Sequence, residues 1–304
     1  ASLPLAARFG DFSINAADVQ RALDAPLLTE EEIETLRSIS LRAAESASPK
    51  RSQGESAVPS SLPSSTAAYK YIADADDLML DDPGDAARGV AHQLGVPYLE
   101  LLGRMAKGVR AIEEECEAHG TEADQRCLSY VLHEAAEAHE GLYEEGRAGQ
   151  KLAYFVQHSN ARAAGLEEVH VVALRYYTSE AFSSLNAPLR RVDGSPHPFA
   201  ATVAFVAEGI KRLRAVDAGD RTPIRVWRGL RNVRGDIPRT GGTERAMLSC
   251  TPDLATAARF ATSREAMLFL ITPKSFMQRG APLDFLSCLP HEREVCYPPC
   301  TYLK

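Results

Sequence analysis

Two carboxylates, Glu292 and Glu294, stand close together near the end of the chain, on either side of an arginine. The residues around Glu294 predict a strand, and residues two apart in a strand point to the same side. Both side chains are therefore expected to project into one space. There a fixed carboxylate can stabilise a developing positive charge, and a second carboxylate can accept a proton. Taken alone, the pair also fits the exposed end of a strand with solvated glutamates.

Two other segments carry groups that can bind an anion or orient a carboxylate. Arg228 ends an expected strand and precedes Gly229. A guanidinium matches the oxygens of a diphosphate, and a glycine lets a ligand approach the backbone closely. Ser249 opens the segment Ser-Cys-Thr, and its hydroxyl can hold a carboxylate in place. Each signal is weak alone, because arginines are common on surfaces and hydroxyls are common in strands.

The elements that must position these residues are short strands in the last third of the chain. Apolar alternation and turn residues predict strands at 224–227, 246–250, 267–272, 294–297 and 302–303, with a short helix at 253–260. The β-branched run 169–174 predicts one more strand, and the apolar spacing of 198–215 predicts a helix.

The first half of the chain is predicted to be helical. Residues 84–165 are expected to form several helices, of which one ends at Gly120, a second spans about 122–145 and a third spans about 150–164. Thr29 and Glu32 have the spacing of a capping box for a helix that runs to about residue 44, and a short helix ending at Leu23 is expected before it. Helices followed by strands predict the α+β class.

Composition excludes several classes of function. The chain has 304 residues and a formal net charge of −7, which disfavours a nucleic-acid partner. We expect no membrane partner, because no apolar run is long enough for a transmembrane helix. No signal peptide is visible, which favours an intracellular protein, although the chain does not begin with Met and could be processed or a fragment.

Cysteine and histidine spacing gives no metal site. The six cysteines include no Cys-x-x-Cys pair, and buried thiols are expected, with one bridge among Cys288, Cys296 and Cys300 left open. His133 and His139 are six apart, whereas the zinc-protease motif needs histidines four apart on one helix face. We therefore expect no metal.

In combination and in this order, the segments resemble the arginine-serine-glutamate class of mono-ADP-ribosyltransferases. That class includes vertebrate arginine-specific ectoenzymes and cholera-toxin-like toxins. The resemblance covers roughly residues 170–304 and departs from the family in one respect, since Ser-Cys-Thr stands where the family has Ser-Thr-Ser. It implies a catalytic core over 168–304, with a mixed β-sandwich and flanking helices. A helical region over 67–167 and an N-terminal extension over 1–66, with a flexible Ser/Pro-rich linker at 45–66, would precede this core.

The family's roles transfer to this sequence as implications of that resemblance. Arg228 would hold the NAD⁺ phosphates, and the backbone of Gly229 would meet the nicotinamide amide. Ser249 would position Glu294, the catalytic glutamate that bonds the nicotinamide-ribose 2′-hydroxyl. Glu292 would direct transfer to arginine. Further positions that resemble NAD⁺-side residues of the family are Phe260, Asn186, Arg190 and Tyr177.

The function implied is the transfer of ADP-ribose from NAD⁺ to arginine side chains of a protein, with release of nicotinamide. This is a glycosyltransferase reaction whose partners would be NAD⁺ and an acceptor protein with an accessible arginine. One alternative is an NAD⁺ glycohydrolase that uses water as acceptor, because that enzyme also needs Glu294. Another is a binding module of the same fold without catalysis, which loss of Arg228, Ser249 or Glu294 would favour; none is lost. The oligomeric state is left open.

Overall fold

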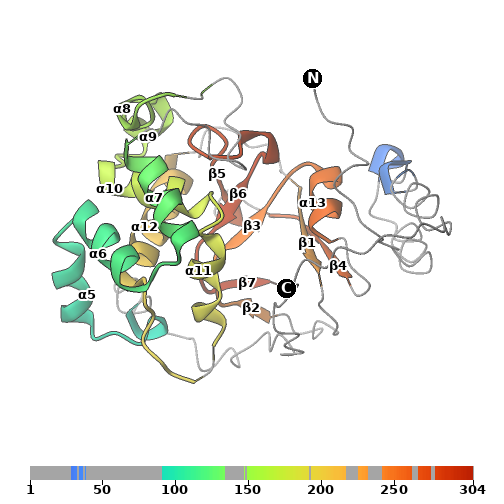
Figure 1. Ribbon diagram of the computed structural model, residues 1–304. Helices are drawn as coiled ribbons and strands as arrows, with labels where there is room; N and C mark the ends of the chain where they lie inside the picture. The colour runs from blue at the N-terminus through green and yellow to red at the C-terminus, as the bar shows by residue number, and fades with distance from the viewer. Residues whose placement is uncertain are drawn as a thin grey trace, which may run out of the picture. The chain divides into compact units, whose positions relative to one another are not determined.

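The computed structural model describes residues 91–133, 149–191, 193–216, 225–231, 242–261, 266–274 and 278–303, together with Arg147 and, near the N-terminus, residues 29–32, 34–36 and 38 (Figure 1). The expected linker at 45–66 and the expected short helix ending at Leu23 lie outside these residues. Helices fill the earlier part of the described chain and short strands fill the last third, which confirms the α+β class.

The chain divides into two compact units. The Arg228 unit consists of Ala1–Lys70, Val226–Asp236 and Asp253–Ile271. The Glu294 unit consists of Tyr71–Arg225, Ile237–Pro252 and Thr272–Lys304. The sequence-predicted site residues are therefore distributed over both units.

The described helices of the Glu294 unit include α5 (Tyr98–Met105), α6 (Val109–His119), α7 (Glu122–His133), α8 (Leu152–Val156), α9 (Ser159–Ala163), α10 (Glu168–Tyr177), α11 (Phe182–Asn186), the 3₁₀ helix η2 (Pro188–Arg190) and α12 (Ala200–Val216). In Figure 1, α10 and α12 lie side by side, and their close contact forms the centre of this unit's core. The predicted helix at 198–215 is confirmed by α12.

Three predictions for the helical region have different outcomes. Gly120 does end α6, and its N–H donates to the carbonyl of Cys116 at 2.8 Å. The second helix begins at Glu122 as expected, and its predicted extension past His133 lies outside the described residues. The third, expected as one helix at 150–164, is instead two. The backbone of His158 is extended, and its Nδ1 accepts from the N–H of Asn160 as a cap for α9.

The strand predicted at 169–174 is wrong, because this run lies within α10. All residues from Val169 to Tyr177 are buried, so no polar face reveals the helical period of 3.6 residues. A short apolar run of this kind cannot be distinguished from a buried strand by periodicity. Burial on every side, against α12 and α7 among others, outweighs the strand preference of its β-branched residues.

The N-terminus of helix α12 is capped by a side chain from another helix. The buried carboxylate of Glu115, on α6, accepts from the backbone N–H groups of Ala201 at 2.8 Å and Thr202 at 2.9 Å. The first N–H groups of a helix have no partner within the helix, and a negative charge there is favourable. Burial raises the pKa of Glu115, while these hydrogen bonds act in the opposite direction.

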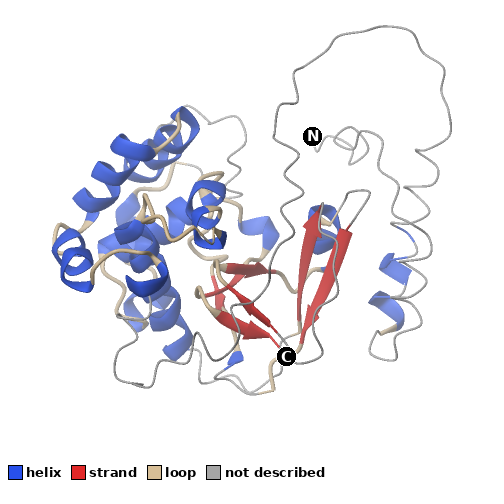
Figure 2. Cartoon of the chain, turned by 90° about the horizontal axis from the view of Figure 1, so that it is seen from below, coloured by secondary structure: helices blue, strands red, loops and turns tan. Residues whose placement is uncertain are grey.

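The described residues of the Arg228 unit contain a two-stranded antiparallel sheet, helix α13 (Leu254–Phe260) and helical residues near the N-terminus. Strand β1 (Val226–Arg231) pairs with β4 (Ala266–Ile271), with Arg228 opposite Phe269. Helix α13 packs on β1, and the two strands are seen together in Figure 2. Leu36, Trp227, Leu254 and Ala257 form the buried cluster. Nearer the N-terminus the predicted capping box is confirmed, since the Thr29 N–H donates to the Glu32 carboxylate at 2.7 Å and the Glu32 N–H donates to Thr29 Oγ1.

The strands of the Glu294 unit form two small antiparallel sheets. In one, β2 (Gly242–Glu244) pairs with β7 (Thr301–Leu303). In the other, β6 (Val295–Tyr297) lies between β3 (Leu248–Cys250) and β5 (Ala281–Pro282). Each of the predicted strands from residue 224 onward corresponds to one of the observed strands, with ends shifted by a few residues.

The six cysteines form no disulfide, and all but the partly buried Cys300 are buried. The bridge left open among the last three is therefore not formed. Within the described residues, no helix combines the length and the apolar character needed to cross a membrane.

Candidate active site

Glu294 lies directly before β6 and is 7% exposed. Its carbonyl accepts from the N–H of Leu283 at 2.8 Å, which continues the pairing of β5 with β6 by one residue. On the other side, β3 pairs with β6 so that Ser249 faces Cys296. The backbone of Glu294 is thus bonded to Leu283 at the beginning of the central strand of a three-stranded sheet.

The register of this sheet places the hydroxyl of Ser249 on the same face as Glu294. Cys250 is opposite Val295, which is the last pair of this register. Residues that face each other on antiparallel strands share a face, as do residues two apart on one strand. Ser249, which is opposite Cys296, is therefore on the same face of the strand pair as Glu294. Cys250 points to the opposite face and is buried.

The expectation that Glu292 and Glu294 share one face of a strand is wrong. Glu292 ends a 3₁₀ helix, η5 (Pro290–Glu292), which a proline initiates. Arg293 then adopts the left-handed conformation, with φ 49° and ψ 49°, before β6 begins. The backbone turns between the two glutamates, so strand alternation does not relate their side chains. Glu292 is half-buried and Glu294 is buried.

Three residues matched to NAD⁺-side positions form hydrogen bonds within the Glu294 unit. The buried Asn186 donates to the hydroxyl of Tyr177 at 3.4 Å and accepts from the N–H of Met247 at 3.2 Å. Arg190 donates to both carboxylate oxygens of Glu244, at 3.1 and 3.3 Å. These contacts tie α10, α11 and η2 to the segment that leads into β3. They give all three residues a structural role, with Arg190 neutralising a carboxylate that is 3% exposed.

The Arg228 unit carries the other sequence-predicted positions. Arg228 lies in β1 and is 8% exposed. Gly229 lies against α13 so closely that a Cβ atom would meet the carbonyl oxygen of Ala257 at 1.9 Å. Phe260 is the last residue of α13, and 45% of its side chain is exposed. The need for glycine at 229 is thus explained by helix packing in this unit.

A buried histidine fixes the loop that connects η2 to α12. His197 donates from Nε2 to the carbonyl of Leu185 at 3.0 Å and accepts at Nδ1 from the N–H of Phe199 at 3.0 Å. These bonds require the neutral ring. Burial lowers the pKa of His197 to about 4, assisted by Arg191 and opposed by the bond to Leu185.

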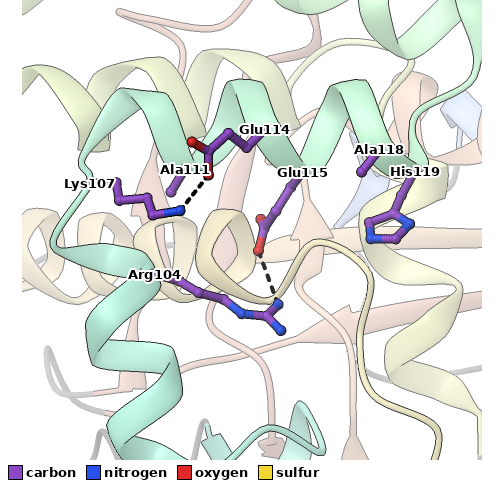
Figure 3. Close-up of a pocket in the computed structure, with 7 residues that line it drawn as sticks. All are labelled: Arg104, Lys107, Ala111, Glu114, Glu115, Ala118 and His119. Atoms are coloured by element: carbon purple, nitrogen blue, oxygen red, sulfur yellow. Dashed lines mark hydrogen bonds and ion pairs between the residues drawn. The ribbon is translucent and has the colours of Figure 1, made fainter.

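A small cavity of about 210 Å³ lies between α5 and α6 and contains none of the sequence-predicted residues (Figure 3). Its cations already have carboxylate partners: Arg104 is 3.8 Å from Glu115, and Lys107 is 2.6 Å from Glu114. The cavity therefore offers no uncompensated charge for a ligand.

The sequence analysis missed two arginines of the Glu294 unit, Arg147 and Arg175. Both donate to backbone carbonyls in the loop that precedes the glutamates. The partner of Arg175 is 111 residues away, which no local pattern reveals. Among the described residues, no group of three or more His, Cys, Asp or Glu side chains is arranged to hold a metal ion.

No family model matches the chain, and no curated protein matches it in sequence. Solved structures do resemble it. The ADP-ribosyltransferase HopU1 of Pseudomonas syringae pv. Tomato DC3000 is 18% identical with a TM-score of 0.39, over 60% of this chain and 89% of that one. The type III effector XopAI from Xanthomonas axonopodis pv. citri is 15% identical with a TM-score of 0.39, over 67% and 88%.

A mutant of the eukaryotic mono-ADP-ribosyltransferase ART2.2, in complex with NADH, is 14% identical with a TM-score of 0.39, over 71% of this chain and 79% of that one. At these identities and TM-scores the likenesses assign no residue role in this chain.

Proposed function

We propose that the chain cleaves the bond between nicotinamide and ribose in NAD⁺ and transfers ADP-ribose to the guanidinium of an arginine in an acceptor protein. One observation carries the proposal: a buried carboxylate, Glu294, whose carbonyl accepts from Leu283 and which shares a sheet face with the hydroxyl of Ser249. Burying a carboxylate is costly, so a site that keeps one at a strand start is typical of a functional group.

The chemistry suits a fixed carboxylate. Departure of nicotinamide takes the electron pair of the C1′–N bond and leaves positive charge on the ribose. A carboxylate held in place stabilises that charge without having to reorganise, and the loss of such a group costs about a hundredfold or more in rate. In this scheme Ser249 holds Glu294, while Arg228 and the backbone of Gly229 bind the phosphates and the nicotinamide amide.

Glu292 is proposed to act on the acceptor. A guanidinium stays protonated in water and is a poor nucleophile. A carboxylate can orient it and accept one proton as its nitrogen forms the new bond to C1′. Because Arg293 turns the backbone between the two glutamates, Glu292 and Glu294 can address different groups. This separation supports one residue for cleavage and another for transfer.

The test uses NAD⁺ labelled in the adenylate part, with agmatine as a small guanidine acceptor. The wild-type protein is expected to release nicotinamide and to label agmatine. Glu294→Gln should lower both activities by about a hundredfold or more, because it removes the fixed charge. Glu180→Gln, at an exposed position, is the matched control and should change neither.

The result separates the competing functions. Glu292→Gln should abolish labelling of agmatine and leave nicotinamide release in place. Nicotinamide release by the wild-type protein without any labelled acceptor would support the glycohydrolase. Absence of both activities, or full activity in Glu294→Gln, would contradict catalysis at this site.

A further inference from the structure

The link between β2 and β3 is bonded through its backbone to two buried side chains. It consists of residues 245–247 and joins strands that belong to different sheets (Figure 1). The N–H of Ala246 donates to Oε1 of Glu244 at 3.0 Å, and the N–H of Met247 donates to Oδ1 of Asn186 at 3.2 Å. Ala246 and Met247 are both 0% exposed, and buried N–H groups need acceptors from within the protein. Side chains supply these acceptors at two successive residues.

Each of these acceptors is held by a second side chain from the helical part of the Glu294 unit. Arg190, in η2, donates from Nε and Nη2 to the two carboxylate oxygens of Glu244, at 3.1 and 3.3 Å. A fork of this kind fixes the plane of a carboxylate as well as its position. Asn186, in α11, donates from Nδ2 to the hydroxyl of Tyr177 at 3.4 Å, which leaves its amide oxygen directed at the link. We call Tyr177, Asn186, Arg190 and Glu244 the β3 brace.

Ser249 lies two residues after the last N–H that the brace bonds. Strand β3 is three residues long, and Ser249 is its middle residue, opposite Cys296 of β6. A strand this short has few ladder hydrogen bonds of its own, and a slip by one residue would turn every side chain to the other face of the sheet. Together with the pairing to β6, the brace therefore sets the point at which β3 begins and the face on which the Ser249 hydroxyl lies.

The charge balance of the brace favours a structural role for Arg190. The side chain of Glu244 is 2% exposed and that of Arg190 is 23% exposed. Removing the cation from a buried ion pair is strongly destabilising, because the remaining charge has lost its compensation. Arg190 could turn to an anionic ligand only by giving up this contact with Glu244. Its guanidinium is therefore better suited to hold Glu244 than to bind a phosphate group.

We propose that Glu244 and Asn186 are positioning residues for Ser249. Arg190 acts through Glu244, so the brace governs the rate of NAD⁺ cleavage rather than the affinity for NAD⁺. The inference rests on the proposed function and adds Glu244, which lies outside the motifs of the sequence. It also differs from the NAD⁺ contact that the family resemblance implies for Asn186 and Arg190.

The proposed activities should depend on the brace in the same way. Nicotinamide release and labelling of agmatine both need Glu294, which Ser249 is proposed to hold. A displacement of about 1 Å can lower the rate of a positioned reaction by up to about a hundredfold. Weakening the brace should therefore lower both rates in parallel.

The first test is Glu244→Gln, which keeps the size of the side chain and turns charge-assisted hydrogen bonds into weaker neutral ones. We expect kcat for both activities to fall about tenfold and KM for NAD⁺ to change by less than about twofold. Equal falls in kcat and kcat/KM mark an interaction that acts in the transition state, whereas a higher KM at unchanged kcat marks lost substrate binding. Arg190→Met should give the same pattern, and Arg190→Lys should retain more of the rate, because lysine keeps the charge without the fork.

A second comparison tests whether the brace acts through Ser249. In a protein that already carries Ser249→Ala, Glu244→Gln should lower kcat no further, because the hydroxyl that the brace positions is gone. A tenfold loss in both backgrounds would overturn the proposal. So would a raised KM for NAD⁺ at unchanged kcat in Arg190→Met, which would assign Arg190 to the substrate instead.

The matched control is Glu208→Gln on α12. Glu208 also accepts from an arginine, since Arg212 donates to it from Nε at 3.0 Å, but this pair lies within one helix, four residues apart. The same substitution there removes a carboxylate from an arginine of the same unit without touching the link. It should change kcat and KM by less than about twofold.

Hydrogen exchange gives a readout that needs no substrate. Glu244→Gln should speed exchange of the N–H of Ala246, and Asn186→Leu should speed exchange of that of Met247, while α12 stays protected. If the wild-type protein shows neither nicotinamide release nor labelled agmatine, the proposed function fails, and this measurement still decides whether the brace holds β3. Unchanged exchange at residues 245–250 in both variants would refute the positioning role.

Discussion

Ser249, Glu294 and Arg228 were chosen from the sequence by residue type and order, and each lies on a short strand or directly at its end. Residue type could predict this much because carboxylates and guanidinium groups beside strands are uncommon inside proteins. Sequence could not predict the turn at Arg293, since a positive φ there depends on the 3₁₀ helix before it. Nor could it predict that Arg190 bonds Glu244, 54 residues away.

At the scale of one residue, His197 should make stability depend on pH. Its folded pKa of about 4 lies below the usual 6.5, so between these values the unfolded chain holds a proton that the folded chain does not. Stability is complete above pH 6.5 and is lost as the pH falls. We expect a loss of about 2 kcal/mol between pH 7 and pH 5, at about 1.4 kcal/mol per pH unit.

Urea unfolding at pH 7 and pH 5 checks this expectation. His170 also has a pKa lowered by burial, so the contribution of His197 is the difference between the wild type and His197→Gln. The variant should lose less stability on acidification, whereas the exposed His119→Gln should behave as the wild type does. The same pH dependence in His197→Gln and in the wild type would contradict the assignment.

At the scale of elements, the type of an element was predicted wrongly where a short apolar run is buried on every side of a helix. Helix α12 and the strands β1, β3, β4, β6 and β7 were predicted, whereas β2 and β5 were not. The wrong prediction concerned α10, which is buried from Val169 to Tyr177, so its sequence shows no alternation of apolar and polar faces with the helical period. The split between α8 and α9 was missed because a histidine cap is a weaker sequence signal than Ser, Thr, Asp or Asn.

The contact between β1 and α13 gives a prediction at this scale. Gly229→Ala places a Cβ 1.9 Å from the carbonyl oxygen of Ala257, so strand and helix must separate. We expect the free energy of unfolding of the Arg228 unit to fall by about 1–3 kcal/mol, as for other overpacked sites. Trp227 is the only tryptophan and lies in this unit's core, so its fluorescence during urea unfolding reports the change.

Gly103→Ala on α5 is the control for this experiment, because nothing lies within 4 Å of the added methyl group. Alanine in a helix interior is expected to be neutral or to stabilise by up to about 1 kcal/mol. A Gly229→Ala protein with an unchanged tryptophan transition would contradict the packing described for β1 and α13.

At the scale of the whole molecule, the six free thiols predict that the fold does not depend on a disulfide. The chain, unfolded in urea without reductant, should give six equivalents with a chromogenic disulfide reagent. In the folded protein the five buried thiols should react slowly, and burial raises the pKa of Cys300, which slows its reaction too. A count of four in urea would mean that one disulfide has formed.

The bond from Arg175 to Leu286 spans 111 residues and has a consequence for synthesis of the chain. The helical part leaves the ribosome long before the loop that supplies this carbonyl. A chain that stops short of the loop retains Arg175, which is 3% exposed in the complete fold, but lacks the carbonyl of Leu286 as its acceptor. Such a loss costs about 1–3 kcal/mol. The helical part of a prematurely terminated chain is therefore expected to have a lower free energy of unfolding than the helical part of the complete chain.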